Sequence, residues 1–257
     1  MRARIGTAGW TIPKAHAAHF PAAGSHLERY AQRLTAAEIN SSFHKPHRRA
    51  TYERWAASVP DDFAFAVKLP KAITHAARLA NAEAALDAFL EQASGLGGKL
   101  HVLLVQLPPS FAFDAPLAAD FFAALRERTE ILVALEPRHA TWFAPDADAL
   151  LAGHKVARVA ADPAVVPEAA QPGGWRGLTY MRLHGAPVIY RSNYEADAIA
   201  RHAALIRGSK APAWCIYDNT TFAAAAANAL ALAGMLQDTA ATSASRPTGR
   251  RVRNRRS

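Results

Sequence analysis

The sequence predicts a single (β/α)8 barrel of the TIM type, and three observations support that fold class. The chain has 257 residues, close to the ~250 residues typical of this fold. Short β-like segments alternate with helical segments along nearly the whole chain, a pattern typical of a parallel sheet covered by helices. Eight such units favour a closed barrel, and no G-x-G-x-x-G motif follows the first strand, which weakens the alternative of a doubly wound dinucleotide-binding fold.

The predicted strands are short apolar runs, two of which (LHVLLVQ and ILVALE) are almost continuously apolar. Such runs are expected for parallel strands that are buried on both faces. In chain order the eight predicted strands are Arg4–Gly6, Ala37–Asn40, Phe63–Val67, Leu100–Gln106, Ile131–Glu136, Val156–Ala160, Thr179–His184 and Ala213–Tyr217.

The predicted helices are bounded by capping and breaking residues. Ser25 is a good N-cap for a helix over His26–Leu34, and Glu28 falls in its first turn. Proline is tolerated at the first turn of a helix, so Pro116 and Pro145 mark two further starts. The remaining predicted helices are Glu83–Ala93, Ala196–Arg207 and Ala223–Leu236.

Two regions depart from the regular pattern. The sixth unit, AADPAVVPEAAQPGGWRG, contains three prolines and predicts a loop with little helix, so the barrel is expected to be irregular there. Residues after about 238 are rich in Thr, Ala, Ser and Arg. We therefore expect a barrel domain over residues 1–237 and a disordered arginine-rich tail over residues 238–257.

Composition indicates which class of protein this is and where in the cell it is expected. Apolar residues make up 51% of the chain and charged residues 20%, enough for a hydrophobic core. No run approaches the ~18 consecutive apolar residues of a membrane span, and the start MRARIGTAGW lacks the apolar region of a signal peptide. The single cysteine, Cys215, excludes an internal disulfide. These features predict a cytoplasmic protein with no membrane-spanning segment.

The net charge of +9 is concentrated at one end of the chain. Residues 1–245 carry only +3, because six arginines follow them: Arg246, Arg250, Arg251, Arg253, Arg255 and Arg256. The tail over Arg246–Arg256 could bind nucleic acid in a salt-sensitive way, or it could be a solvated terminus without a role.

The candidate active site is predicted from the residues that end the strands, because TIM-type barrels bind and convert substrates at that face. Glu38 or Glu136 would act as a general base, and His184 as a general acid or oxyanion stabiliser. Lys68 completes the predicted catalytic set. Carboxylates and cations that converge at one rim perturb each other's pKa values, which is typical of acid–base sites.

Other strand-end residues are predicted to bind the substrate. Arg138 and Arg182 favour an anionic ligand, a phosphate or a carboxylate, which arginine can contact in a bidentate way. Arg138 could instead form a structural salt bridge with Glu136. The predicted binding residues that follow from position are Asn40, Arg138, Trp142, Asp162, Arg182 and Asn219.

No cofactor is required by the sequence. The pairs His16/His19 and His44/His47 have a spacing that metal ligands can use, but eleven histidines make such pairs expected by chance. A divalent metal held by Glu, Asp and His side chains at the rim remains an alternative.

Eight ordered motifs carry a resemblance to a known family: GTAGW (6–10), EINSSFHK (38–45), FAFAVKLPKAITH (63–75), LVQLPPSF (104–111), LEPRHATW (135–142), AAD (160–162), YMRLHG (180–185) and YDNT (217–220). Over residues 2 to about 236 the chain resembles the YecE-like family, known as domain of unknown function seventy-two. The resemblance implies a TIM-type barrel whose activity is not established. It also implies a role for His75, which joins the predicted binding residues.

The chain departs from the usual family pattern in ways that keep the charged set. Glu136 is followed by Pro137, which can sit there only where strand pairing has ended. Asp218 adds a carboxylate where the family usually has asparagine.

Two hypotheses about function stay open. One is an enzyme that performs hydrolysis, isomerisation or proton transfer on a small anionic or phosphorylated substrate. The other is a non-catalytic ligand-binding or nucleic-acid-associated protein that uses the same basic rim and the arginine tail. The substrate, the reaction and the oligomeric state do not follow from the sequence.

Overall fold

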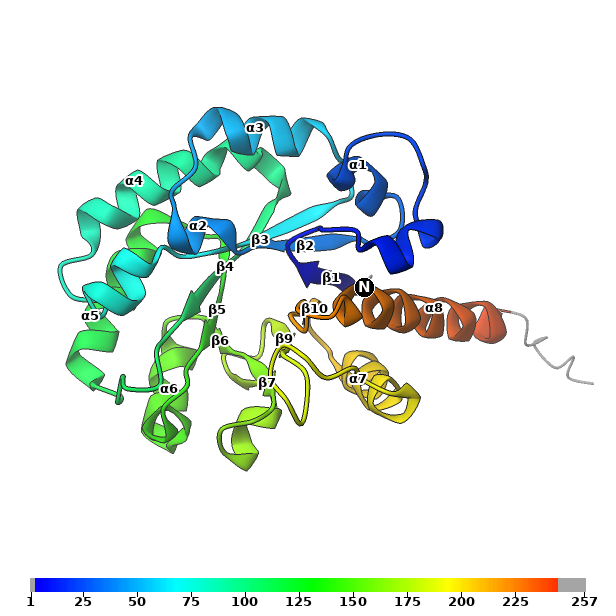
Figure 1. Ribbon diagram of the computed structural model, residues 1–257. Helices are drawn as coiled ribbons and strands as arrows, with labels where there is room; N and C mark the ends of the chain where they lie inside the picture. Colours follow the sequence, from blue (N-terminus) through cyan, green and yellow to red (C-terminus); the bar gives the residue numbers. More distant parts are fainter. Residues whose placement is uncertain (1–2, 245–257) are drawn as a thin grey trace, which may run out of the picture.

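The computed structural model describes residues 3–244 and contains a parallel barrel surrounded by helices (Figure 1). Its strands are arranged in the order β7-β9-β10-β1-β2-β3-β4-β5-β6-β8. Their bounds are β1 (Arg4–Ala8), β2 (Ala36–Ile39), β3 (Ala64–Lys68), β4 (Leu100–Gln106), β5 (Leu132–Glu136), β6 (Val156–Arg158), β7 (Ala160–Asp162), β8 (Gly173–Gly174), β9 (Thr179–Leu183) and β10 (Ala213–Tyr217). The predicted TIM-type fold is confirmed.

The barrel closes through one interrupted strand. β6 pairs in parallel with β5, and β7, which begins two residues after β6 ends, pairs in parallel with β9. The two short strands therefore share the sixth position of an eight-stranded barrel. No long helix follows them: the chain forms the short turn η5 (Pro167–Ala170) and then β8, which runs antiparallel to β6. The predicted irregularity of the sixth unit is confirmed, and its three prolines supply the physical reason.

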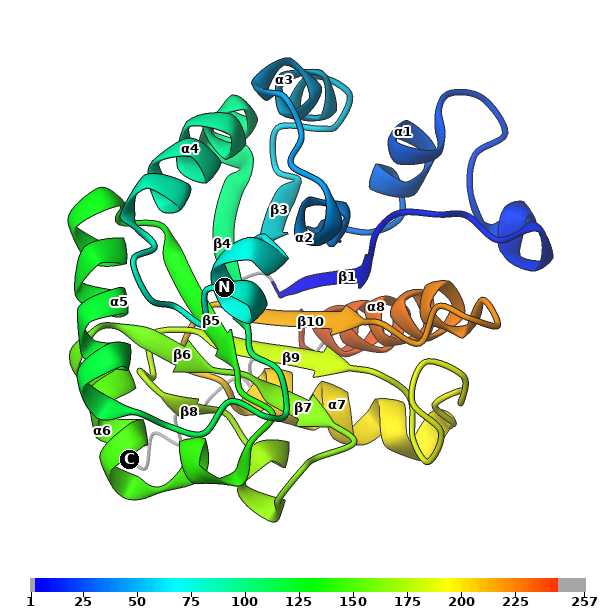
Figure 2. The ribbon, with the colours of Figure 1, turned by 60° about the vertical axis from the view of Figure 1, so that its left-hand side comes forward.

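The helices lie outside the sheet, as Figure 2 shows for α4, α5 and α6. Their bounds are α1 (His26–Ala31), α2 (Ser41–His44), α3 (Arg49–Ala57), α4 (Glu83–Ala93), α5 (Ala115–Arg128), α6 (Pro145–Gly153), α7 (Ala196–Gly208) and α8 (Ala224–Ala244). α3 is not among the predicted helices. α8 continues eight residues beyond its predicted end and past the predicted domain boundary at 237. The tail arginines from Arg246 onward lie outside the described residues.

Local capping explains where α1 and α5 begin. Ser25 caps α1, as the sequence predicts, and the structure adds that Glu28 completes a reciprocal capping box with it. At α5 the Asp114 carboxylate accepts a hydrogen bond from the Leu117 backbone N–H at 3.1 Å. Both caps satisfy backbone donors that a helix start leaves without a partner.

The barrel interior is filled by side chains from alternate strand positions. Alanines on β2 and β3 leave room for the large rings of Tyr180 and Trp214, whose centroids lie 5.9 Å apart in a stacked arrangement. The interior apolar cluster includes Ala36, Ala64, Ala66, Val102, Leu104, Ala134, Ala157, Val159, Tyr180, Trp214 and Ile216. Because side chains alternate between faces, the next inward positions along the strands place Glu38, Lys68, Gln106, Glu136 and Arg182 above this apolar filling.

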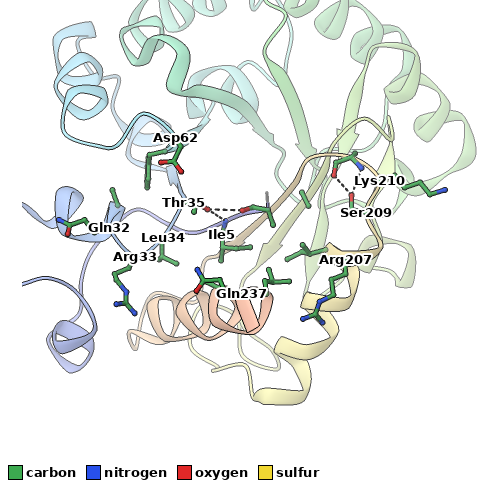
Figure 3. Close-up of a pocket in the computed structure, with 18 residues that line it drawn as sticks. Ile5, Gln32, Arg33, Leu34, Thr35, Asp62, Arg207, Ser209, Lys210 and Gln237 are labelled. Carbon is green, nitrogen blue, oxygen red and sulfur yellow. Dashed lines mark hydrogen bonds between the residues drawn. The ribbon is translucent and has the colours of Figure 1, made fainter. Parts of the chain in front are cut away.

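A cavity of about 760 Å³ lies at the opposite, N-terminal end of the strands (Figure 3). Its lining includes Ile5, Thr35 and Asp62 from the starts of strands and Arg207 and Lys210 from the end of α7 and the following loop. In barrels of this type that end contributes stability, whereas chemistry takes place at the carboxyl ends.

Within residues 3–244, no helix is long and apolar enough to cross a membrane.

Gly6 on β1 lies so close to the neighbouring strand that it leaves no room for a side chain. A Cβ at this position would lie 2.0 Å from the carbonyl oxygen of Ala36 on the neighbouring strand, so β1 would have to move. We expect Gly6→Ala to lower the free energy of unfolding by about 1–3 kcal/mol, measured by chemical denaturation. Gly98→Ala is the matched control, because its Cβ meets nothing within 4 Å. Equal stability of the two variants would contradict this account.

Candidate active site at the carboxyl ends of the strands

Arg182 is the centre of a buried network of charges. The guanidinium, 1% exposed, donates Nε–H and Nη2–H to the two oxygens of Glu38 at 3.0 and 2.7 Å. Nη2 also donates to Asp218 at 3.0 Å, and Nη1 donates to Glu136. The Tyr180 hydroxyl adds a hydrogen bond to Glu38 at 2.8 Å. Arg182 therefore connects β9 with β2, with β5 and with the end of β10.

His184, directly after β9, lies between two carboxylates. Its Nε2 is 2.9 Å from Glu136 Oε1 and its Nδ1 is 3.2 Å from Asp218 Oδ2. Only the protonated ring can donate from both nitrogens, so this geometry favours the imidazolium. Burial by itself would lower the pKa of His184, but Glu136 and Asp218 outweigh it and raise the pKa above its ordinary value of 6.5.

The two carboxylates beside His184 are held in the ionised form. Burial would raise the pKa of Glu136, yet Arg182 and then His184 hold that pKa well below its ordinary value of 4.5. The same opposition lowers the pKa of Asp218, where burial acts against Arg182 and His184. Both carboxylates are therefore weak proton acceptors near neutral pH.

Lys68 ends β3 and is the exception in this network. It is 8% exposed, and its Nζ lies 3.9 Å from the centroid of the Phe43 ring. Among residues 3–244 no carboxylate lies within ion-pair distance of Nζ. Burial, followed by the charge of Arg182, lowers the pKa of Lys68 to about 8, although three nearby carboxylates oppose the shift.

Two further groups, Arg138 and His75, lie next to these residues. Arg138 binds Glu136 Oε1 through Nε and Nη2, both at 3.1 Å, and its side chain is 23% exposed. The ring of His75, from the turn η2 (Ala72–Ala76), lies 4.9 Å from that of Phe43. Burial lowers the pKa of His75, and the neighbouring Lys68 lowers it further. His75 is therefore neutral near pH 7.

Polar groups without a partner also occur here. The side-chain oxygens of Asn40 and Asn219 are buried and make no hydrogen bond with the described residues. The Asn219 amide donates to Ser192 O and Asn228 Oδ1, both at 2.9 Å, which fixes its orientation. Buried polar atoms are rarely left unsatisfied, so these two oxygens are exceptions at the carboxyl ends of β2 and β10.

The structure corrects the predicted role of Asp162. This residue ends β7, but Ala161 is the residue that packs with the interior cluster, so the alternation turns Asp162 to the outside of the barrel. Its carboxylate lies beside Tyr194, whose pKa is raised by burial and then by Asp162. Asp162, Tyr194 and His202 line a separate cavity of about 440 Å³ between β7, β9 and α7.

Trp142 is also not part of the site. It lies in the turn η4 (Ala140–Phe143), is fully buried, and donates its indole N–H to the carbonyl oxygen of Phe111 at 2.9 Å. The rings of Phe111 and Phe113 pack edge-on against it. Trp142 therefore anchors the loops after β4 and β5 instead of contacting a ligand.

Of the other predicted residues, the network unites Glu38, Glu136, Arg138, Arg182 and His184, and Lys68 and His75 lie beside it. Four site residues are missing from the predicted set: Phe43, Tyr180, Asp218 and Tyr190. The Tyr190 ring packs edge-on against that of His184, with centroids 5.7 Å apart. Two of these left a signal in the sequence. Asp218 ends an apolar strand, and Tyr180 precedes Arg182 by two positions and therefore shares its face.

A metal held at the rim finds no support in the described part of the chain. Residues 3–244 contain no group of three or more His, Cys, Asp or Glu side chains arranged to hold a metal ion. The carboxylates that could serve as ligands are instead bound to Arg182 and His184.

Residues 4–251 match the family model described as "Protein of unknown function DUF72". The chain belongs to this family. Over 119 residues it is 29% identical to the UPF0759 protein YecE of Escherichia coli (strain K12), an alignment covering 46% of this chain and 43% of YecE. The chain thus aligns with less than half the length of that curated relative.

Two crystal structures of family members share the fold. The DUF72 protein of Enterococcus faecalis V583 has a TM-score of 0.75 and 21% identity, covering 92% of this chain and 96% of that one. The protein of Thermotoga maritima MSB8 has a TM-score of 0.75 and 22% identity, covering 92% of this chain and all of that one. At this identity the likeness concerns the fold alone.

The network around Arg182 predicts a stability effect. Arg182→Gln would leave Glu38, Glu136 and Asp218 buried without their common cation. We expect a loss of about 3–5 kcal/mol in the free energy of unfolding, measured by urea denaturation. The control is Arg201→Gln, which removes an exposed ion pair with Asp197 and should leave the denaturation midpoint unchanged. Similar midpoints for the two variants would show that the network does not stabilise the fold.

The lowered pKa values predict the acid side of the stability profile. Glu136 and Asp218 have ordinary values of 4.5 and 3.8, and lower values in the folded chain. Below about pH 5 the unfolded chain takes up protons that the folded chain does not. The free energy of unfolding therefore decreases as the pH is lowered. Denaturation at about pH 6, 4.5 and 3.5 measures this slope. Asp218→Asn should make the slope shallower, and an unchanged slope would contradict the assignment.

Proposed function

We propose that this protein is an enzyme that performs acid–base chemistry on a small anionic or phosphorylated substrate at the carboxyl end of the barrel. One observation carries the proposal: a buried site holds both a proton donor, His184 between Glu136 and Asp218, and an amine, Lys68, without an ion-pair partner among the described residues. Titratable groups whose pKa values are shifted in opposite directions within one site are typical of acid–base catalysis.

The contacts favour particular roles within the site. Both oxygens of Glu38 are bound to Arg182, and Tyr180 adds a further hydrogen bond, so Glu38 positions Arg182. Glu136, with its lowered pKa, is better suited to orient His184 than to accept a proton. His184 is the general acid, and Lys68, with a pKa of about 8, is the group that can lose a proton near neutral pH.

The balance of charge supports an anionic ligand. Arg182, His184, Lys68 and Arg138 face three carboxylates, which leaves an excess of positive charge when all four are protonated. A phosphate or carboxylate would neutralise this excess, with Arg138 as the partly exposed contact. Gln106 and the unpaired oxygens of Asn40 and Asn219 would orient the uncharged part of the ligand.

A ligand-binding protein without turnover is the alternative, because the same groups would hold an anion without converting it. Binding of nucleic acid through the arginine tail is a separate possibility that concerns Arg246–Arg256, outside the described residues. We further propose a cytoplasmic setting, in keeping with a single, buried cysteine, Cys215.

Proton transfer can be tested without knowing the substrate. The protein is incubated in D2O with a panel of phosphorylated sugars and of hydroxy and keto acids, and deuterium uptake or bond cleavage is followed by NMR. For a compound that reacts, we expect His184→Gln to reduce the rate about 10²–10⁴-fold, while Arg201→Gln keeps it. A panel member that binds to the wild type and never changes would instead favour the non-catalytic alternative.

A further inference from the structure

We propose that Lys68 acts as a nucleophile, forming an imine with the carbonyl carbon of an aldehyde or ketone that also carries an anionic group. This inference rests on the proposed function, and it names both the substrate class and the covalent step.

The carboxylates of the site form ion pairs with groups other than Lys68. Arg182 binds Glu38, Glu136 and Asp218, and His184 binds the last two again. Lys68 Nζ faces the Phe43 ring at 3.9 Å and has no hydrogen bond or ion pair with any described residue. A lysine that served only to neutralise charge would be expected to pair with one of the nearby carboxylates.

The surroundings also favour the neutral amine. Lys68 is buried and shares the site with Arg182, and these are the two conditions that activate nucleophilic lysines. With a pKa of about 8, roughly a quarter of the Lys68 side chains are unprotonated at pH 7.5. An ordinary lysine, with a pKa of 10.5, is unprotonated in only about one molecule in a thousand at that pH.

The covalent step can be written with the groups that are present. The Nζ lone pair attacks the carbonyl carbon, the C=O π electrons move to oxygen, and a proton passes from nitrogen to that oxygen, giving a carbinolamine. A second proton, from the His184 imidazolium, lets the hydroxyl group leave as water. A carbon–nitrogen double bond remains, and the positive charge moves from His184 to the iminium nitrogen.

The iminium explains why acid–base groups would surround the amine. It withdraws electrons from the adjacent carbon, so a C–H or C–C bond there breaks more easily, and a neighbouring acid–base pair can move the proton. The anionic group of the substrate would lie against Arg138, the partly exposed arginine of the site. The substrate class is therefore an anionic carbonyl compound.

Pyridoxal 5′-phosphate is a suitable probe because it is an aldehyde that carries a phosphate. The full chain is incubated with the probe and cyanoborohydride at about pH 7.5, and the reduced adduct is located by peptide mass spectrometry. We expect about one label per chain, on Lys68, with a labelling rate that rises with pH around a midpoint near 8. Excess inorganic phosphate should slow this labelling.

Lys71 provides the matched control, because it lies three residues away on an exposed part of the same segment. Lys71→Arg should keep the label, and Lys68→Arg should remove it, with circular dichroism confirming that both variants fold. The wild-type site of labelling and its pH midpoint need no variant, so they test the inference even if Lys68→Arg does not fold.

Labelling spread over the exposed lysines, or a Lys68 midpoint above about pH 10, would overturn the inference. The proposed function fails separately: if the D2O assay detects turnover while Lys68 stays unlabelled, acid–base chemistry stands and the imine does not. If Lys68 is labelled selectively and no panel compound reacts, the amine is nucleophilic and the proposed turnover is unsupported.

Discussion

The ion pairs of Arg182 are the interaction on which the site depends. One guanidinium, 1% exposed, meets carboxylates from β2, β5 and the end of β10. Each of these charges would be costly to bury alone, because burial removes its hydration. Together these ion pairs cross the barrel above its apolar filling and connect β9 with β2, with β5 and with the end of β10. The positions of His184 and Arg138 depend on the same carboxylates, because His184 lies between Glu136 and Asp218 and Arg138 binds Glu136.

The same ion pairs also shift the pKa values of the neighbouring groups. Arg182 lowers the pKa values of Glu136 and Asp218, and these two carboxylates in turn raise the pKa of His184. The carboxylates are bound to Arg182 and His184, whereas Lys68 Nζ lies over the Phe43 ring and forms no ion pair within residues 3–244. The network therefore also surrounds the two groups of the proposed chemistry, His184 and Lys68, which lie at the same end of the barrel.

Membership in the DUF72 family and the likeness to two of its crystal structures concern the barrel, not a reaction. Because one fold can host many activities, function depends on the groups in the site and not on the barrel. The interrupted sixth strand, β6 and β7, decides which of its residues reach the site. It closes the barrel without a covering helix, and it turns Asp162 away from the site toward Tyr194 and His202.

The sequence by itself determined the eight-unit barrel, because the apolar runs and their polar ends are local patterns; Leu100–Gln106 and Ala213–Tyr217 match the observed strands to the residue. It also determined most of the charged residues at the strand ends. Only the tertiary structure decided which way each side chain points and which charges meet. Asp162 and Trp142 end or follow strands yet face elsewhere, and Asp218 joins the site because Arg182 reaches it from β9. Contacts of this kind join strands far apart in the chain, and no local pattern records them.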